Sequence, residues 1–416
     1  MNYSRIILIL LLFTASASLF AQFQPSDLKN PESLGMSTDS LAQMSAYFHQ
    51  LVDEDSLAGV QIGIIRLGEL IHFDSYGFSD IENDKSLKTN SLFRIFSMTK
   101  PIVSVALMQL YEQDKFELED PLHKYIPSFK NTSTLEDSTL QASKNPIRII
   151  DLLRHTSGYS YGNTQNPLLR EYYIKANLNA SKTNEEFVDK LSKIPLQFEP
   201  GTDWQYGLST NICGRLIEVL SGKSLDQYLK NHILTPLKMN DTHFQMPKEK
   251  IERFTVGYGW NAENGLFVVE NVEDNRYVHE VTLFNGGGGL VSTTFDYLKF
   301  CQMLLNKGSL GDIQILKSTT IDLMLSDHLK EVRPHQINPL RLPPGEASFG
   351  LGFAIRGEHP ESLEQLFGWG GAVGTYFKID LKHNLAYVMM IQLSPYRHLE
   401  LRAKIQDFIN GAIVES

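Results

Sequence analysis

The sequence of 416 residues has little of what marks a metalloprotein, a disulfide scaffold or a nucleotide-binding protein. Its two cysteines, Cys213 and Cys301, could pair, but each stands within an apolar helical pattern that favours a small buried side chain. Its twelve histidines include no His-x-x-x-His or His-Glu-x-x-His spacing, and no cysteine joins them in a metal-binding pattern. The glycine run at residues 286–289 lacks the Gly-Lys-Ser/Thr ending of a phosphate loop and instead indicates a close backbone approach. The sequence therefore predicts no metal and no cofactor.

Positive charge is also scarce, because 38 lysines and arginines stand against 48 aspartates and glutamates, a net charge of −10 at pH 7. No basic run and no patch of interleaved aromatic residues interrupts this balance, which argues against nucleic acid as a partner. The hydrophobic content of 42% over this length can bury a large core. The length suggests two or three domains, or one domain with a big insertion.

The N-terminal segment has the pattern of an export signal. Arg5 precedes an unbroken apolar run at residues 6–13, and small residues follow at positions 15–18. Eight apolar residues are too few to span a bilayer. We expect a signal peptide cleaved after Ala21, or alternatively after Ala17, and a periplasmic or secreted mature protein with no integral membrane span. An uncleaved, membrane-associated segment is the other interpretation.

Ser97 and Lys100 place a hydroxyl and an amine one helical turn apart, so their side chains share a face. Pro101 and the apolar residues at 102–110 indicate a helix that begins near Ser97. The partial positive charge at a helix N-terminus favours an alkoxide at Ser97 and disfavours a charged ammonium at Lys100. The pattern predicts a serine nucleophile with its base in reach. The weaker interpretation is that Ser97 only caps the helix and that Lys100 is solvated.

Two other serines compete for this role. Ser26 and Lys29 have the same spacing, but no apolar helix follows them. Ser160 lies in a Gly-x-Ser-x-Gly sequence, the nucleophile elbow of α/β-hydrolases, which needs a buried strand before it and a helix after it. Residues 149–155 favour a helix and residues 163–167 a loop, so the context argues against Ser160.

Two further segments extend the pattern. Tyr206 stands in a loop ahead of the amphipathic stretch 210–220, and a Trp-Gly-Gly triplet at residues 369–371 precedes the alternating segment 375–381. With these segments in order, the chain resembles the serine β-lactamase and penicillin-binding-protein superfamily over residues 38–409. Within it, the chain is most similar to the class C-like esterases called family VIII carboxylesterases. The other matching stretches are residues 153–158, 236–242 and 287–293.

The resemblance implies roles for individual residues. Ser97 matches the acylated serine, while Lys100 and Tyr206 match the pair that takes the serine proton and returns it to the leaving alcohol. The backbone N–H groups of Ser97 and Ala372 would form the oxyanion hole. A serine near neutral pH does require a neighbouring base, and a tetrahedral oxyanion does require fixed donors. The substrate-binding residues implied in the same way are Trp369, Gly370, Gly371 and Leu208.

Two departures from the lactamase pattern bear on the substrate, which we expect to be a small-molecule ester or amide. Leu208 replaces the Asn of Tyr-x-Asn, and Trp369 replaces the lysine of Lys-Thr-Gly. An apolar wall without that cation favours neutral esters over anionic β-lactams or D-alanyl-D-alanine peptides, unless Arg356 or Arg397 supplies the charge. The sequence thus predicts a carboxylesterase. The alternatives are a β-lactamase or D,D-peptidase, an acyltransferase, or a catalytically silent acyl- or antibiotic-binding protein, and the oligomeric state is left open.

Strand patterns at both ends of the chain frame a mostly helical middle. Residues 60–66 and 70–77 indicate one hairpin, and residues 376–381 and 385–392 indicate another. We therefore expect an α/β (α+β) protein with an antiparallel sheet flanked by helices, built from both chain ends, and an inserted all-α domain. The resemblance implies the same fold, with the active site in the cleft between the two parts. The predicted parts are a signal peptide (residues 1–21), a discontinuous α/β domain (22–112 and 285–416) and a mainly helical domain (113–284).

Overall fold

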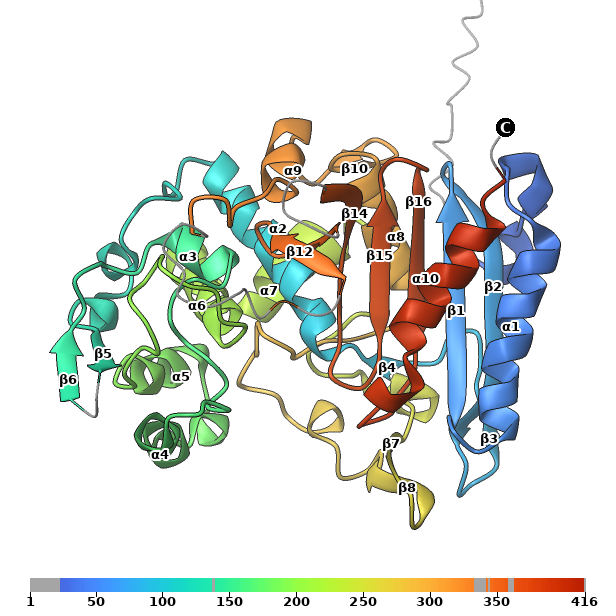
Figure 1. Ribbon diagram of the computed structural model, residues 1–416, viewed down its shortest axis with the longest axis horizontal. Coiled ribbons are helices and arrows are strands. Elements are labelled where there is room, and N and C mark those ends of the chain that lie inside the picture. The colour runs from blue at the N-terminus through green and yellow to red at the C-terminus, as the bar shows by residue number, and fades with distance from the viewer. Residues whose placement is uncertain (1–22, 137–138, 333–341, 343–344, 358–362, 415–416) are drawn as a thin grey trace, which may run out of the picture.

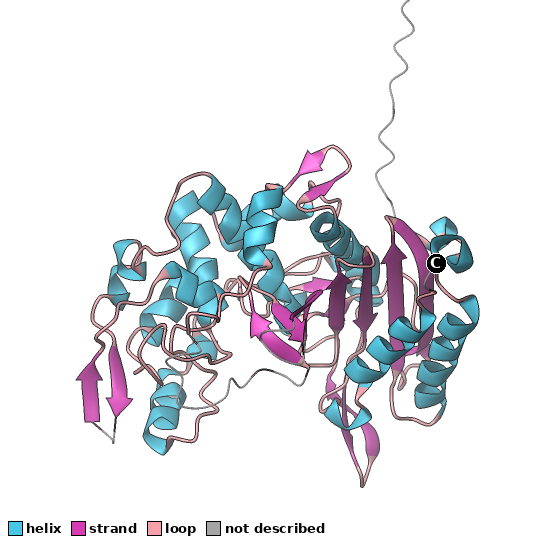
Figure 2. Ribbon diagram, turned by 45° about the horizontal axis from the view of Figure 1, so that its top comes forward, coloured by secondary structure: helices cyan, strands magenta, loops and turns pink. Residues whose placement is uncertain are grey.

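An antiparallel sheet with flanking helices forms one part of the molecule, and a cluster of helices forms the other (Figure 1). Figure 2 shows the same division by secondary structure, with most helices gathered on the side away from the sheet. The predicted signal peptide lies outside the described residues and stays a prediction. The computed structural model describes residues 23–136, 139–332, 342, 345–357 and 363–414.

The large sheet has eight strands in the order β12-β13-β14-β15-β16-β1-β2-β3, and every neighbouring pair is antiparallel. Strand β1 lies beside β16, with Gln61 opposite Met390, so the two chain ends meet in the middle of the sheet. The predicted sheet built from both ends is confirmed. The strands are β1 (Gly59–Arg66), β2 (Glu69–Asp80), β3 (Lys85–Ser86), β12 (Glu346–Phe349), β13 (Ala354–Gly357), β14 (Leu363–Gly370), β15 (Tyr376–Asp380) and β16 (Leu385–Met390).

Helices cover both faces of this sheet. Helices α1 (Thr38–Asp53) and α10 (Leu401–Ala412) pack together on one face, and α8 (Thr294–Leu305) lies on the other. Strand β1 permits a close approach of α8 at Gly63, where a Cβ atom would lie only 2.8 Å from Cδ1 of Leu298. The sheet is thus buried on both faces. This packing holds in place the ends of the strands whose connecting loops line the site.

Helix α2 (Thr99–Glu112) runs between the two parts and is apolar on almost every side. A helix with apolar residues all round is one that the core surrounds, and α2 packs beside α6 (Ser209–Ser221) of the helical part. Cys213 in α6 and Cys301 in α8 are buried free thiols, as predicted. The remaining helices are α3 (Ile149–Leu153), α4 (Pro167–Ala176), α5 (Asn184–Leu191), α7 (Leu225–Leu229) and α9 (Ser318–Met324).

Short strands complete the fold. The segment predicted as mainly helical contains two hairpins besides its helices, β5–β6 at the outer end of the helical part and β7–β8 below the sheet (Figure 1). The predicted domain boundaries themselves stay a prediction. The short strands are β4 (Phe93–Arg94), β5 (Ser133–Glu136), β6 (Thr139–Ala142), β7 (Gly257–Asn261), β8 (Gly265–Glu270), β9 (Val291–Ser292), β10 (Ser309–Leu310) and β11 (Ile313–Gln314).

Across the described ranges, we find no helix that combines the length and the apolar composition needed to cross a membrane. The same residues contain no group of three or more His, Cys, Asp or Glu side chains arranged to hold a metal ion.

Candidate active site

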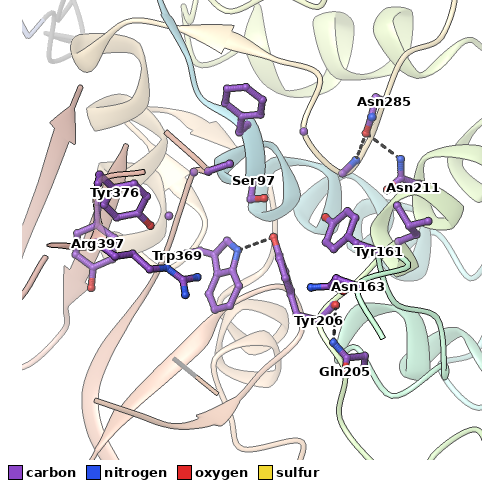
Figure 3. A pocket seen from close by; sticks show the side chains of 18 of the residues that line it. Ser97, Tyr161, Asn163, Gln205, Tyr206, Asn211, Asn285, Trp369, Tyr376 and Arg397 are labelled. Atoms are coloured by element: carbon purple, nitrogen blue, oxygen red, sulfur yellow. Dashed lines mark hydrogen bonds between the residues drawn. The ribbon is translucent and has the colours of Figure 1, made fainter. Parts of the chain in front are cut away.

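Ser97 lies in the short connection between strand β4 and helix α2. It stands in a 3-10 turn, Phe96–Met98, and the α-helix begins two residues later at Thr99. The sequence placed Ser97 at the start of the helix itself, whereas in the structure it lies two residues before the first residue of α2. Phe96 has a φ of 41°, a left-handed conformation that is uncommon for a bulky residue. The turn presents the Ser97 side chain to a cleft instead of to the core (Figure 3).

Lys100 lies in the first turn of α2, only 2% exposed. Its Nζ atom donates to Ser97 Oγ at 3.3 Å and to Tyr161 Oη at 2.8 Å, and it also donates to the backbone oxygen of Gly287. An ammonium group has three N–H bonds, and each of them has an acceptor here. The predicted pairing of Ser97 with Lys100 is therefore present as a direct contact.

The charge state of Lys100 differs from the sequence expectation. Burial alone would lower the pKa of Lys100, but the oxygens of Tyr161 and Tyr206 raise it, and the net pKa lies above its ordinary value. Burial raises the pKa of Tyr161 to about 12, although the Lys100 ammonium pulls it down. Lys100 is thus an ammonium at neutral pH. The helix N-terminus does not discharge it, because three oxygen atoms surround the amine.

Tyr206 comes from the loop that leads into α6. Its ring lies 4.8 Å from Lys100 Nζ, measured to the ring centroid, and its oxygen accepts a 3.0 Å hydrogen bond from Nε1 of Trp369 (Figure 3). The Trp369 ring packs against it at a centroid distance of 4.9 Å. Lys100 and Trp369, which are far apart in sequence, thus both lie close to Tyr206. Lys100 brings a cation near its phenol group, and Trp369 gives its oxygen a neutral N–H donor.

Tyr161 is a site residue that our sequence analysis did not single out. It lies in the Gly-x-Ser-x-Gly stretch, whose Ser160 is 1% exposed and receives at Oγ the N–H of Gly162, 3.1 Å away. Ser160 is turned away from the cleft, while Tyr161 lines it and contacts Lys100. The competing nucleophile elbow is thus excluded by position. Ser26 and Lys29 are also excluded, because both are exposed near the N-terminal end of the described chain.

The glycine run after Asn285 approaches helix α6 closely, as the sequence predicted. A Cβ atom at Gly286 would lie 2.8 Å from the backbone oxygen of Thr210, and one at Gly287 would overlap the Asn211 amide. This approach lets the Gly287 carbonyl reach Lys100. Asn211 and Asn285 are joined by a 2.8 Å hydrogen bond and both line the cleft, so side-chain amides are present although Leu208 replaces the expected one.

The cleft has a volume of about 1250 Å³, and both parts of the molecule line it. Lys100 lies beneath its floor and contacts three residues that line it, Ser97, Tyr161 and Gly287. Ala372 is exposed in the turn after β14, and within the described chain its N–H donates to no other group. The structure therefore brings the predicted site residues into one place. Those that line the cleft are Ser97, Tyr206, Leu208, Trp369, Gly370, Gly371 and Ala372.

Arginines line the same cleft on the side of the sheet. The Arg397 side chain extends toward the Trp369 indole (Figure 3), and within the described residues its guanidinium has no acidic partner. Arg356 instead pairs with Glu364 at 3.3 Å. Among the described residues, Arg397 and Arg402 both line this side of the cleft without an acidic partner, and Arg397 extends toward Trp369, the position of the missing lysine.

Comparisons with known proteins agree with this fold. Protein Rv1367c of Mycobacterium tuberculosis is 28% identical over 375 residues, 86% of this chain and 92% of that protein. Esterase EstB of Burkholderia gladioli is 30% identical over 243 residues, 55% of this chain and 57% of EstB. The structure of EstCE1, described as a hydrolase with promiscuous acyltransferase activity, is similar at a TM-score of 0.74 and 25% identity, over 89% of this chain and 98% of that one.

The fold and the serine–lysine contact define a serine hydrolase of the kind that includes esterases and penicillin-binding proteins. The chain belongs to the Beta-lactamase family, whose sequence model matches residues 44–408.

Proposed function

We propose that the protein is an exported serine hydrolase that cleaves carboxylic esters through an acyl-enzyme on Ser97. The observation that carries the proposal is the 3.3 Å contact between Ser97 Oγ and the buried Lys100 amine, on the floor of a large cleft. The names of the relatives EstB and EstCE1, an esterase and a hydrolase, support the same chemistry.

The reaction begins with attack of Ser97 Oγ on the ester carbonyl carbon. The serine proton passes to the Tyr206 oxygen, which accepts it as a phenolate. The nearby Lys100 ammonium and the Trp369 N–H stabilise the negative charge of this phenolate. The same proton then goes to the leaving alkoxide as the C–O bond breaks. A water molecule attacks the acyl-enzyme in the second half-reaction and gives its proton to the same oxygen, and Ser97 recovers a proton as the acid leaves.

The developing oxyanion needs two fixed donors, which we assign to the backbone N–H groups of Ser97 and Ala372. Both residues line the cleft, and the Ala372 N–H has no acceptor among the described groups. A donor that is already fixed and has no protein acceptor before substrate binds costs no reorganisation during the reaction, which is the condition for effective stabilisation.

The substrate class follows from the cleft walls. Trp369 and Leu208 lie next to Tyr206 and present apolar surface, and Leu178 and Phe187 continue an apolar wall on the helical side. Neutral esters of short acyl groups match this surface, because a carboxylate held against it would lose water without gaining a cation. Arg397 is the observation that favours a second candidate, a β-lactamase or D,D-peptidase, since it could receive a carboxylate beside Trp369.

A substrate panel with the purified protein tests the proposal. The panel contains nitrophenyl esters, a chromogenic cephalosporin and a D-Ala-D-Ala peptide, each offered with and without an alcohol as acyl acceptor. We expect ester hydrolysis to dominate, a fluorophosphonate adduct on Ser97, and loss of both in Ser97→Ala. The matched control Ser160→Ala should keep the adduct. Cephalosporin turnover equal to ester turnover would replace the esterase with the second candidate, and a predominant ester product would indicate an acyltransferase.

Export is tested separately. A fusion of residues 1–21 to a reporter that is active only outside the cytoplasm should give signal, and replacement of the apolar run at residues 6–13 by polar residues should abolish it. Retention of the full-length protein in the cytoplasm, with no processed N-terminus by mass spectrometry, would contradict export.

A further inference from the structure

Arg402, on the first turn of α10, lines the same cleft and contacts the turn that carries Ala372. Its Nη2 atom donates to the backbone oxygen of Gly371 at 2.9 Å and to that of Thr375 at 3.4 Å. Its guanidinium lies between the rings of Tyr376 and Tyr396, 4.9 Å from each ring centroid. The cation is therefore held on both faces by aromatic rings while its edge holds the two carbonyls that bracket the turn.

The Gly371 carbonyl and the Ala372 N–H belong to one peptide unit. This unit is trans. In a planar trans peptide the C=O and N–H bonds point in opposite directions. A contact that fixes the Gly371 oxygen on the Arg402 side thus directs the Ala372 N–H away from Arg402. A cation at the carbonyl also polarises the amide, which makes its N–H a stronger donor.

The glycines of the triplet are explained by the same arrangement. A Cβ atom at Gly370 would overlap Nη2 of Arg402, and one at Gly371 would overlap Oγ1 of Thr375. The Gly371 N–H donates to the Thr375 oxygen at 2.8 Å. Gly370 therefore leaves room for the Arg402 guanidinium. This guanidinium binds the carbonyl oxygens at both ends of the turn, Gly371 and Thr375, and so orients the peptide between Gly371 and Ala372.

We propose that Arg402 is a positioning residue for the oxyanion hole: it orients and polarises the peptide between Gly371 and Ala372 and acts on the reaction through that peptide. The inference rests on the proposed function, because it assigns a support to the donor that we placed at Ala372. Its contribution is expected in the transition state and not in ground-state binding, since the oxyanion exists only there.

The test compares Arg402→Ala and Arg402→Lys with Lys404→Ala, which removes an exposed cation from the same helix, away from the cleft. For a nitrophenyl ester we expect Arg402→Ala to lower kcat about 10- to 100-fold, below the full cost of about 10²- to 10³-fold for deleting one oxyanion donor, with KM within about twofold. Affinity for an alkyl trifluoromethyl ketone, which forms an oxyanion on Ser97, should fall in parallel with kcat/KM. Lys404→Ala should match the unmodified protein, and Arg402→Lys should recover only part of the loss because it lacks the planar fork.

Two further measurements separate positioning from folding. Added guanidinium ion at low millimolar concentration should raise kcat of Arg402→Ala saturably and leave Lys404→Ala unchanged. Gly370→Ala should cost activity in the Arg402 background and little more in the Arg402→Ala background, because the side chain that it displaces is already absent. Equal kcat/KM and equal ketone affinity in Arg402→Ala and Lys404→Ala would overturn the inference. An active Ser97→Ala would instead overturn the proposed function, so the two failures are distinguishable.

Discussion

The indole N–H of Trp369 donates a 3.0 Å hydrogen bond to the phenol oxygen of Tyr206. Trp369 stands where lactamases have a lysine, and from sequence its side chain looked like an apolar wall. The structure adds a polar function to that wall, because the indole presents its N–H edge to the oxygen that we propose as the proton acceptor. A neutral donor stabilises charge on that oxygen without adding a cation that would attract an anionic substrate.

Trp369→Phe should therefore lower kcat for a neutral ester by about 5- to 10-fold, the equivalent of about 1 kcal/mol for one neutral hydrogen bond. Trp204→Phe is the matched control, since the Trp204 ring also packs near Tyr206 but its buried Nε1 has no hydrogen-bond partner among the described groups. Steady-state kinetics on both variants decides the matter. A loss in Trp204→Phe as large as that in Trp369→Phe would show that ring packing, and not the N–H, is responsible.

Tyr206→Phe and Lys100→Ala should each reduce turnover by about 10² or more, the usual scale for removing a general acid–base. The Lys100 ammonium stabilises the negative charge that lets the Tyr206 oxygen accept the serine proton, so the two groups depend on each other. Acylation and deacylation can be followed separately by stopped-flow release of nitrophenol. Near-full activity of Tyr206→Phe would rule out the proton relay.

Tyr161→Phe tests the contact that sequence analysis missed. It removes one of the three acceptors of the Lys100 ammonium, the hydroxyl at 2.8 Å, but leaves the Tyr206 oxygen in place. We expect a loss of about 10-fold, smaller than for Tyr206→Phe, because a hydrogen bond to a charged group contributes about 1.5–3 kcal/mol and part of that is recovered by water in the cleft. If Tyr161→Phe were as damaging as Tyr206→Phe, Tyr161 would have to carry the proton itself.

Arg397→Ala separates neutral from anionic substrates. The side chain is exposed and lies toward Trp369, so its removal should leave kcat/KM for a butyrate ester within about twofold and raise KM for an ester that carries a carboxylate in the leaving group. The difference between the two substrates should shrink as salt is added, because an exposed charge is screened. Equal effects on both esters would show that Arg397 shapes the cleft without recognising charge.

The lowered pKa of His243 should make the free energy of unfolding depend on pH, independently of the active site. Burial and, to a smaller extent, the neighbouring Lys250 charge lower the pKa of His243 to about 4, against the opposing effect of Asp241. The unfolded chain binds a proton near pH 6.5, so between about pH 6.5 and pH 4 the unfolded state binds more protons and stability falls as pH falls. The free energy of unfolding should drop by about 2–3 kcal/mol across this range. His243→Asn should flatten this part of the profile in urea titrations, and an unchanged slope would contradict the assignment.

The parts of the site that could be predicted are those fixed by local geometry or by an ordered set of motifs. The Ser97–Lys100 contact follows from the spacing of one helical turn, although the serine lies in a 3-10 turn before the α-helix. Tyr206 and Trp369 were located by their glycine-rich surroundings. The two terminal hairpins followed from alternation of apolar residues, which also indicated that the sheet joins both chain ends.

Other features depend on contacts that no local pattern encodes. Tyr161 and Tyr159 stand two residues apart in the same glycine-flanked stretch, yet one reaches Lys100 and the other is fully buried. Arg402 contacts the Gly371 carbonyl from a helix near the other end of the chain. The raised pKa of Lys100 also reflects the oxygens of Tyr161 and Tyr206, from two separate segments, so the expectation of a discharged amine, drawn from the helix end alone, was wrong.

The pairing of β1 with β16 sets the order in which the site can form during folding. The helical part can assemble from contacts between residues close in sequence, whereas the middle of the sheet must wait until Met390 has reached Gln61, with most of the chain between them. This step is slow because the entropy cost of closing so long a loop comes before the contacts between the strands can stabilise it. Ser97 follows strands β1 to β4, and Ala372 lies between β14 and β15 near the other end of the chain. The nucleophile and its proposed oxyanion donor therefore come together only when the sheet closes. The rate at which ester hydrolysis recovers during refolding should therefore equal the rate at which β1 pairs with β16. A chain that stops short of β16 should be inactive even when its helices have formed.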